Sequence, residues 1–185
     1  DAGGGGGVRT AALITNMDSP LGSAVGNSLE VIESVEILKG KTSGDLWTVC
    51  RELSCRMLML AGIGDRDECG RLVDEAVKSG EALKRFEMMV KLQGGDVSYI
   101  EDTSKFRKAS FSREVHAPAD GYIIHMDSEK IGLTAVLLGA GREKKDDDIN
   151  HAAGIIIAAK TGDFVKRGEL LATLFADDES RLDGA

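Results

Sequence analysis

Three glutamates, Glu30, Glu33 and Glu36, follow one another at three-residue intervals just after the stretch SPLGSAVGN, residues 19–27. Carboxylates in pairs can work as general acid and base, and carboxylate oxygens can also hold a hard cation. On a helix, such charges ordinarily form a face in contact with water. Glu33 stands out because the helix start before it contains two glycines, each costing up to about 1 kcal/mol relative to Ala in a helix. Those glycines indicate either a close approach of the backbone to another group or a site built by the main chain.

The histidines and two short loops give weaker signals. His116, His125 and His151 lack metal-ligand spacing to any cysteine or carboxylate, which favours structural roles. The run Asp146–Asp148 could attract a hard cation, but an acidic run beside two lysines is typical of a solvated loop. The stretch Gly139–Arg142 combines two glycines with a guanidinium, and it could bind an anion or simply cap the preceding helix.

Composition excludes several classes of protein. The 185 residues are 42% hydrophobic and 4% aromatic, with a formal net charge of −8. The charge argues against nucleic-acid binding, and no apolar run approaches the roughly 20 residues that span a bilayer. Three cysteines without CxxC spacing argue against a disulfide framework or a zinc site. We therefore expect an intracellular, cytoplasmic protein. No nucleophile elbow, phosphate-binding loop or dinucleotide fingerprint occurs.

Hydrophobic periodicity predicts the elements of the first half. The short apolar run at residues 8–15 predicts a buried strand of an α/β sheet. Pro20 is predicted to open a helix that continues to about Leu38. Apolar residues at helical spacing predict three further helices, at about residues 45–60, 66–78 and 81–92.

The second half of the sequence alternates short strand-like stretches with turns and one helix, and is therefore predicted to be α+β. Around a Pro/Asp/Gly turn, the stretch from Arg113 predicts a hairpin of two short strands. A helix is expected from Glu129 to Leu138, and strands are expected in GIIIAAK and, after a turn, in TGDFVKRGELLATLFADD. The expected organisation is a first domain at 1–95, a connection at 96–112 and a second domain at 113–185.

The segment ALITNMDSPLGSAVGNSLEVIESVEILKG, residues 12–40, closely resembles the thymidine and pyrimidine-nucleoside phosphorylase family. In that family a strand ends in T-[DN]-M and is followed by P-L-G, A-V-G-N and L-E-V. The stretches GEALKRFEMMVKLQGGD, APADGYIIHMD, IGLTAVLLGAGR and TGDFVKRGELLATLFA are similar to later parts of the family, in the same order. The resemblance implies the end of the family's central α/β domain, followed by a C-terminal α+β domain of barrel-sandwich type.

The resemblance also implies an activity. Such enzymes are pentosyltransferases that split pyrimidine (deoxy)nucleosides with inorganic phosphate, reversibly, into free base and (deoxy)ribose 1-phosphate. The family's phosphate-binding Lys-His-Ser segment and its pyrimidine-binding Arg, Ser and Lys precede the position of Val8. We therefore expect no catalytic residue within this chain, which resembles a C-terminal part that also stops before the family's usual end, and we expect it to be inactive by itself. The family forms homodimers mainly through N-terminal helices, so a dimer is expected of the whole enzyme and not of this part alone.

A monovalent cation of the potassium type is bound between the lobes of the bacterial family members. Its ligands include main-chain oxygens of the P-L-G-x-A segment and a carboxylate further along the same helix. Carried over residue by residue, these fall on Leu21, Ala24 and Glu33. The resemblance further implies lobe closure over substrate, with the Gly139–Arg142 loop at the closed cleft.

Two other readings stay open at the level of sequence. APADGYI and GDFVKRGELLATL also resemble strands of biotinyl and lipoyl carrier domains, although the M-K-M or D-K-A tripeptide of such carriers does not occur. The chain could also be a stand-alone binding or dimerisation module without a catalytic lobe.

Overall fold

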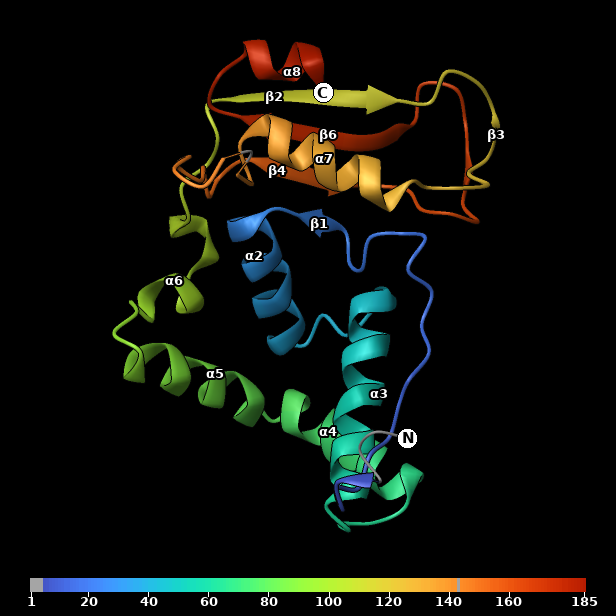
Figure 1. Ribbon diagram of the computed structural model, residues 1–185, viewed down its shortest axis with the longest axis vertical. Helices are drawn as coiled ribbons and strands as arrows, with labels where there is room; N and C mark the ends of the chain where they lie inside the picture. The colour runs from blue at the N-terminus through green and yellow to red at the C-terminus, as the bar shows by residue number, and fades with distance from the viewer. Residues whose placement is uncertain (1–4, 143) are drawn as a thin grey trace. The chain divides into compact units, whose positions relative to one another are not determined.

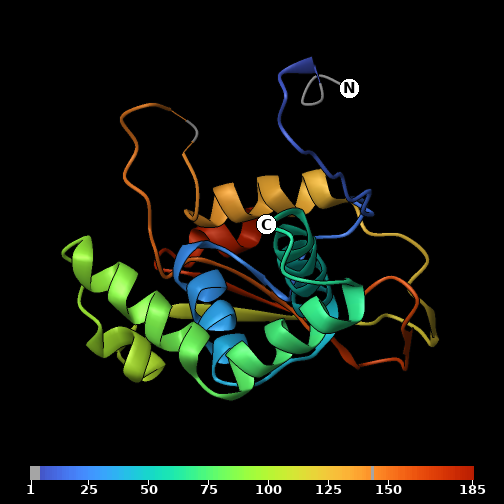
Figure 2. The same cartoon turned by 90° about the horizontal axis from the view of Figure 1, so that it is seen from below.

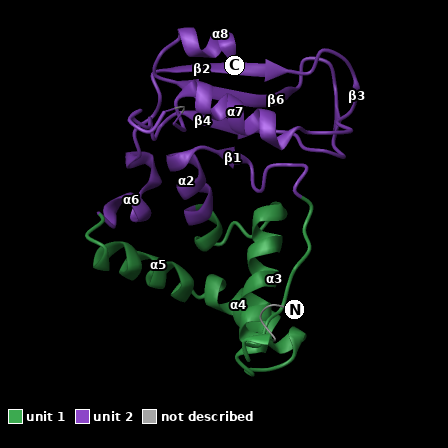
Figure 3. Ribbon diagram, viewed as in Figure 1, with its two compact units in different colours: residues 1–16, 36–95 green, residues 17–35, 96–185 purple. Residues whose placement is uncertain are grey.

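The computed structural model of the protein describes residues 5–142 and 144–185. The chain forms two compact units, one from residues 1–16 and 36–95 and the other from residues 17–35 and 96–185 (Figure 3). The first unit is helical, and the second combines helices with antiparallel strands (Figure 1). Residues 17–35 thus join the sheet-bearing unit although they lie early in the sequence.

Three amphipathic helices build most of the first unit: α3 (Gly44–Leu60), α4 (Arg66–Lys78) and α5 (Glu81–Leu92). Helices α3 and α4 pack together, and Cys55 and Cys69 are buried in this unit. Arg51 on α3 forms a bidentate ion pair with Asp74 on α4, with N···O distances of 2.6 and 2.7 Å. All three predicted helices are confirmed to within a residue of their expected bounds, because their apolar periodicity is strong.

A four-stranded antiparallel sheet is the centre of the second unit. Its order is β1 (Ala24–Val25), β4 (Gly154–Ile157), β6 (Leu170–Ala176) and β2 (Phe111–His116). The short strands β3 (Gly121–Tyr122) and β5 (Phe164–Val165) form a separate pair. The helical pieces of this unit are α2 (Asn27–Leu38, which continues into the first unit), α6 (Ser98–Glu101), the 3₁₀ turn η1 (Thr103–Lys105), α7 (Ser128–Leu138) and α8 (Ser180–Gly184).

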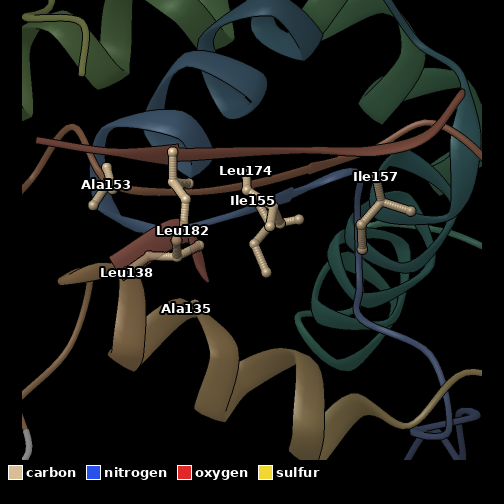
Figure 4. Close-up of a cluster of buried hydrophobic side chains, with 8 residues drawn as sticks. Ala135, Leu138, Ala153, Ile155, Ile157, Leu174 and Leu182 are labelled. Carbon is tan, nitrogen blue, oxygen red and sulfur yellow. The ribbon is translucent and has the colours of Figure 1, made fainter. Parts of the chain in front are cut away.

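Helices α7 and α8 cover one face of this sheet (Figures 1 and 2). Leu138 and Leu182, from these two helices, pack with Ile155 and Leu174 from the central strands (Figure 4). Ala153, which directly precedes β4, is fully buried, so the start of β4 is held inside this core. The core therefore fixes the strand beside which β1 and the glycine-rich segment lie.

The expected buried strand at residues 8–15 is wrong. This stretch forms no strand, and the side chains of Val8 and Ile14 are 64% and 98% exposed. An apolar strand of an α/β sheet needs neighbouring strands and covering helices. Among the described residues no strand pairs with it, so its apolar pattern finds no partner.

The helix expected from Pro20 begins seven residues later, at Asn27. Gly22 and Gly26 adopt φ values of +76° and +142°, outside the helical region, and the two-residue strand β1 lies between them. The hairpin expected after Arg113 is also wrong, because β2 pairs with β6 and β3 pairs with β5. Within the described ranges the strands form open antiparallel sheets, so the α+β character is confirmed without a closed barrel.

In the part of the chain that the structure describes, no helix is both long and apolar enough to cross a bilayer.

Candidate functional site

The candidate site is the turn that leads into β1 and α2, residues 19–24, together with Glu33 on α2. The Glu33 carboxylate accepts hydrogen bonds from two consecutive main-chain amides, Ser23 N to Oε1 at 2.7 Å and Ala24 N to Oε2 at 3.0 Å. Charge-assisted bonds of this kind are about twice as strong as neutral ones. One side chain on α2 thereby fixes the main chain of the turn nine and ten residues earlier.

The two glycines of the opening stretch are explained by close approach. A Cβ atom on Gly22 would lie 2.6 Å from Oε2 of Glu33, and one on Gly26 would lie 2.6 Å from the carbonyl oxygen of Ala153. Both positions also have positive φ, which residues other than glycine rarely adopt. The glycines therefore let the turn pass against Glu33 on one side and against the start of β4 on the other.

The three residues expected to bind a cation are brought to one place. Ile157 N on β4 donates to Ser23 O at 2.7 Å, so Ser23 faces β4 and the next residue, Ala24, faces away from it. The Ala24 N–H points to Glu33, and the carbonyl of the same residue lies along that outer edge of the strand. Leu21 is half exposed and directly precedes Gly22, the glycine that lies against the Glu33 carboxylate.

The chemistry of this donor set suits a hard monovalent cation. Each oxygen of Glu33 accepts one of the two main-chain hydrogen bonds described above and retains lone-pair capacity, since a carboxylate offers about four acceptor positions. Main-chain carbonyls and carboxylates are the ligands that hard cations prefer. Within the described residues no group of three or more His, Cys, Asp or Glu side chains could hold a metal ion. A cation at this turn would therefore depend on main-chain oxygens.

The other two glutamates of the series have separate roles. Glu30 accepts a bond from Gly26 N at 2.9 Å and so caps the start of α2, while Glu36 pairs with Lys41 at 2.5 Å. The three carboxylates thus do not converge as an acid and base pair. Each instead fixes a different stretch of main chain or a neighbouring lysine.

The start of α2 is tied to the Gly139–Arg142 loop. The Asn27 side-chain amide donates to Ala140 O at 2.8 Å, and Ser28 N donates to His151 O at 3.0 Å. Asn150 N in turn donates to Gly139 O at 2.9 Å. The helix that carries Glu33 therefore also positions the loop that contains Arg142.

His116 and Asp147 both make contacts close to them in the fold. His116 lies on the exposed side of β2, with its ring between Gly168 O and the Glu114 carboxylate, each at 3.0 Å. Asp147 accepts a bond from the main-chain amide of Lys144 at 2.8 Å, which is a local turn contact.

Sequence reasoning missed a polar network around Asp177, just after β6. Its carboxylate accepts bonds from the amide and hydroxyl of Ser110, both at 2.9 Å, from the Asn150 side chain at 2.8 Å, and from Arg107. Arg107 first, and then Ser110, hold the pKa of Asp177 well below its ordinary value. No local pattern signals this network, because its members are 27 to 70 residues apart.

Comparisons with known proteins agree with this picture. The family described as pyrimidine nucleoside phosphorylase C-terminal domain matches residues 122–185. The pyrimidine-nucleoside phosphorylase of Bacillus subtilis is 41% identical over 175 residues, and that of Geobacillus stearothermophilus is 38% identical over 174 residues. A relative of the same name from Staphylococcus aureus is 38% identical over 172 residues.

These matches cover 92 to 94% of the chain and 40% of each relative, so the chain spans about two fifths of the length of the curated relatives it matches. Residues 122–185 match the C-terminal domain of these phosphorylases. The chain belongs to the pyrimidine-nucleoside phosphorylase family.

Proposed function

We propose that the chain acts as the C-terminal part of a phosphorylase that cleaves pyrimidine (deoxy)nucleosides with inorganic phosphate. The products would be the free base and (deoxy)ribose 1-phosphate, in a reversible pentosyl transfer. The observation that carries the proposal is the 41% identity to the Bacillus subtilis pyrimidine-nucleoside phosphorylase over 94% of the chain. The carrier-domain alternative is not favoured, because the same stretches match phosphorylases.

Phosphate would attack the anomeric carbon of the nucleoside while the bond to the pyrimidine breaks. Positive charge develops on the sugar in such transition states, as in glycoside cleavage generally. The enzyme must hold phosphate close to the sugar and stabilise the negative charge of the departing base. The proposal assigns those two tasks to residues outside these 185, so the chain alone should not release base.

The role proposed for this chain is to supply part of a cation site and a loop at the cleft. Leu21 and Ala24 would offer main-chain oxygens and Glu33 its carboxylate to a potassium-type ion. When bound, such an ion would supply a fixed positive charge that draws further oxygen ligands toward this turn. The two Glu33 contacts and the outward direction of Ala24 support this assignment.

The loop Gly139–Arg142 is proposed to face the closed cleft. It borders an open cavity of about 570 Å³ whose lining includes Gly139, Gly141, Lys144 and Arg181. Asp147 and Asp148 also line this cavity and offset its two basic side chains, so the proposed contact with an anionic group depends on the neighbouring Arg142 and on the glycine main chain. Asn27 would hold this loop at a fixed position relative to Glu33, which lies on the same helix.

A chimera tests the proposal directly. The matching segment of the Bacillus subtilis enzyme is replaced by this chain, and base release from uridine and thymidine is measured with and without phosphate. We expect phosphate-dependent release by the chimera and none by the chain alone. A control is the same chimera with Glu33→Gln, which keeps one acceptor oxygen but loses the charge, and which should respond less to KCl.

A folded chimera, shown by circular dichroism and a cooperative melt, that releases no base would contradict the proposal. Base release by the chain alone would contradict the assignment of the reacting groups to residues outside it. The whole enzyme is proposed to be a homodimer, and size-exclusion chromatography of the active chimera tests that part separately.

A further inference from the structure

The turn at residues 19–24 is held not only by Glu33 but also by the loop that follows β4. The Lys160 ammonium donates to Pro20 O at 2.8 Å, and the hydroxyls of Thr161 and Ser19 lie 3.2 Å apart. These contacts join residues about 140 positions apart in the sequence. They lie within the second unit, whose sheet also provides the bond from Ile157 N to Ser23 O.

The carbonyls that accept these hydrogen bonds each directly precede a carbonyl that is proposed as a ligand. Lys160 takes the oxygen of Pro20 and Ile157 takes that of Ser23. The proposed ligand oxygens belong to Leu21 and Ala24, each one residue further along. The direction of a carbonyl follows from the orientation of its peptide plane, and adjacent planes are linked by only two soft torsions. Fixing Pro20 O and Ser23 O therefore constrains the directions of the main-chain oxygens of Leu21 and Ala24.

The loop that carries Lys160 is itself held firmly. Ala158 N donates to Leu171 O on β6 at 2.8 Å, Gly162 N donates to Ile123 O at 2.8 Å, and Lys160 N donates to the Asp163 carboxylate at 2.8 Å. The ring of Pro20 fixes its own φ, so the first residue of the held turn is stiff as well. A contact between two stiff segments transmits position, which a contact between flexible ones would not.

We infer that Lys160 is a positioning residue for the cation site: by holding Pro20 O it sets the direction of the Leu21 and Ala24 carbonyls relative to the Glu33 carboxylate. This inference rests on the proposed function, because the cation site is part of that proposal. Lys160 is not assigned as a ligand, since an ammonium group has only hydrogen-bond donors.

The charge of Lys160 makes the inference testable, because it acts in the opposite direction to the positioning role. A positive group near a cation site repels the cation, so removing the charge alone should strengthen binding. Removing the contact should weaken binding by letting the carbonyls turn away. Lys160→Met removes both while keeping the apolar stem, and Lys160→Arg keeps a positive donor.

The experiment measures the thermal melting midpoint of the Bacillus subtilis chimera, which also contains the part of the proposed cation site outside these 185 residues, in KCl and in tetramethylammonium chloride at equal ionic strength. Binding to the folded state raises the midpoint, and the difference between the two salts isolates the effect of potassium. We expect a potassium-dependent rise in the wild type and in Lys160→Arg, and its loss in Lys160→Met. An equal or larger rise in Lys160→Met would overturn the inference.

Hydrogen exchange in tetramethylammonium chloride separates this inference from the cation proposal. We expect the amides of Ser23 and Ala24 to exchange faster in Lys160→Met than in the wild type, because the turn is released even without potassium. If the wild type shows no potassium-dependent rise but this exchange effect is present, the cation proposal fails and Lys160 still positions the turn. Unchanged exchange in Lys160→Met would overturn the positioning role itself.

Discussion

Asp177 joins three parts of the second unit through one carboxylate. It binds Ser110, which precedes β2, Asn150 in the loop before β4, and Arg107 in the connection after η1. Asn150 also holds Gly139 O through its main-chain amide. Asp177 therefore acts at a distance on the loop that contains Arg142, and its ionisation state should matter to the stability of the unit.

Asp177 gives a prediction about acid stability. Its pKa is lower in the folded state than its ordinary value of 3.8, so the unfolded chain binds more protons at this carboxyl. The stability that it contributes is therefore fully present above pH 3.8 and is lost as pH falls below that value. We expect Asp177→Asn to lower the urea midpoint at pH 7 and to flatten the loss of stability as pH falls below about 4, measured by circular dichroism.

Asp183→Asn is the matched control for this prediction. Asp183 also pairs with an arginine, Arg113, but its side chain is 75% exposed, and exposed pairs contribute little. Its pH profile should follow the wild type. An Asp177→Asn profile that runs parallel to that of the wild type would show that Asp177 does not link stability to pH.

At this scale the sequence predicted what local spacing can carry and no more. Glu33 stood out because it follows a helix start with two glycines, and the structure places it against that turn. Its assignment as a cation ligand came from the family resemblance. Asp177 was missed because its partners come from distant segments that only the folded chain brings together. Lys160 was missed for the same reason, since Pro20 is 140 residues away.

Among the elements, the close crossing of β1 and β4 determines where the candidate site lies. Gly26 and Gly154 lie at this crossing with φ values of +142° and +148°. A Cβ atom on Gly154 would lie 2.3 Å from Val25 O, which is closer than any real side chain approaches. The crossing thus requires glycine both for backbone conformation and for space.

Gly154→Ala should therefore destabilise the second unit more than the same substitution at a glycine that has positive φ but no close neighbouring atoms. The matched control is Gly168→Ala, where φ is +82° and nothing lies within 4 Å of the added Cβ. The control should cost about 1–2 kcal/mol of unfolding free energy, which is the ordinary cost of a left-handed residue. Gly154→Ala should cost at least about 2 kcal/mol more, since main-chain atoms must move.

Urea unfolding monitored by far-ultraviolet circular dichroism measures both variants. Equal losses in the two would mean that the strands separate at no cost and that the crossing is not constrained by packing. The amides of Ser23 and Ala24, followed by hydrogen exchange, should lose protection in Gly154→Ala and keep it in Gly168→Ala.

Helices were easier to predict than strands for a physical reason. The periodicity that defines α3, α4 and α5 is local, so a window of sequence contains the whole signal. The run at residues 8–15 has the composition of a buried strand, but burial depends on neighbours that the described residues do not supply. The supposed hairpin failed likewise, because the choice of strand partner is a long-range property.

For the molecule as a whole, the residues proposed to take part in the function lie in only one of the two units. The first unit is a set of helices with buried cysteines, and burial raises the pKa of the Cys69 thiol, which keeps it protonated and unreactive. The second unit holds Glu33, the turn at residues 19–24 and the Gly139–Arg142 loop. The proposed contributions to phosphorolysis therefore come from the second unit.

The loop at the cleft gives the last prediction, which belongs to the whole enzyme. If Arg142 meets an anionic group when the lobes close, Arg142→Ala in the Bacillus subtilis chimera should lower kcat/KM for uridine phosphorolysis about tenfold or more, which corresponds to about 1.4 kcal/mol of transition-state stabilisation. The melting midpoint should stay unchanged, because the side chain is exposed in the structure. Lys145→Ala, a charge removal in the same loop, is the control and should keep kcat/KM within twofold. Unchanged turnover by a folded Arg142→Ala chimera would remove the loop from the proposed cleft and leave Glu33 and its turn as the chain's contribution.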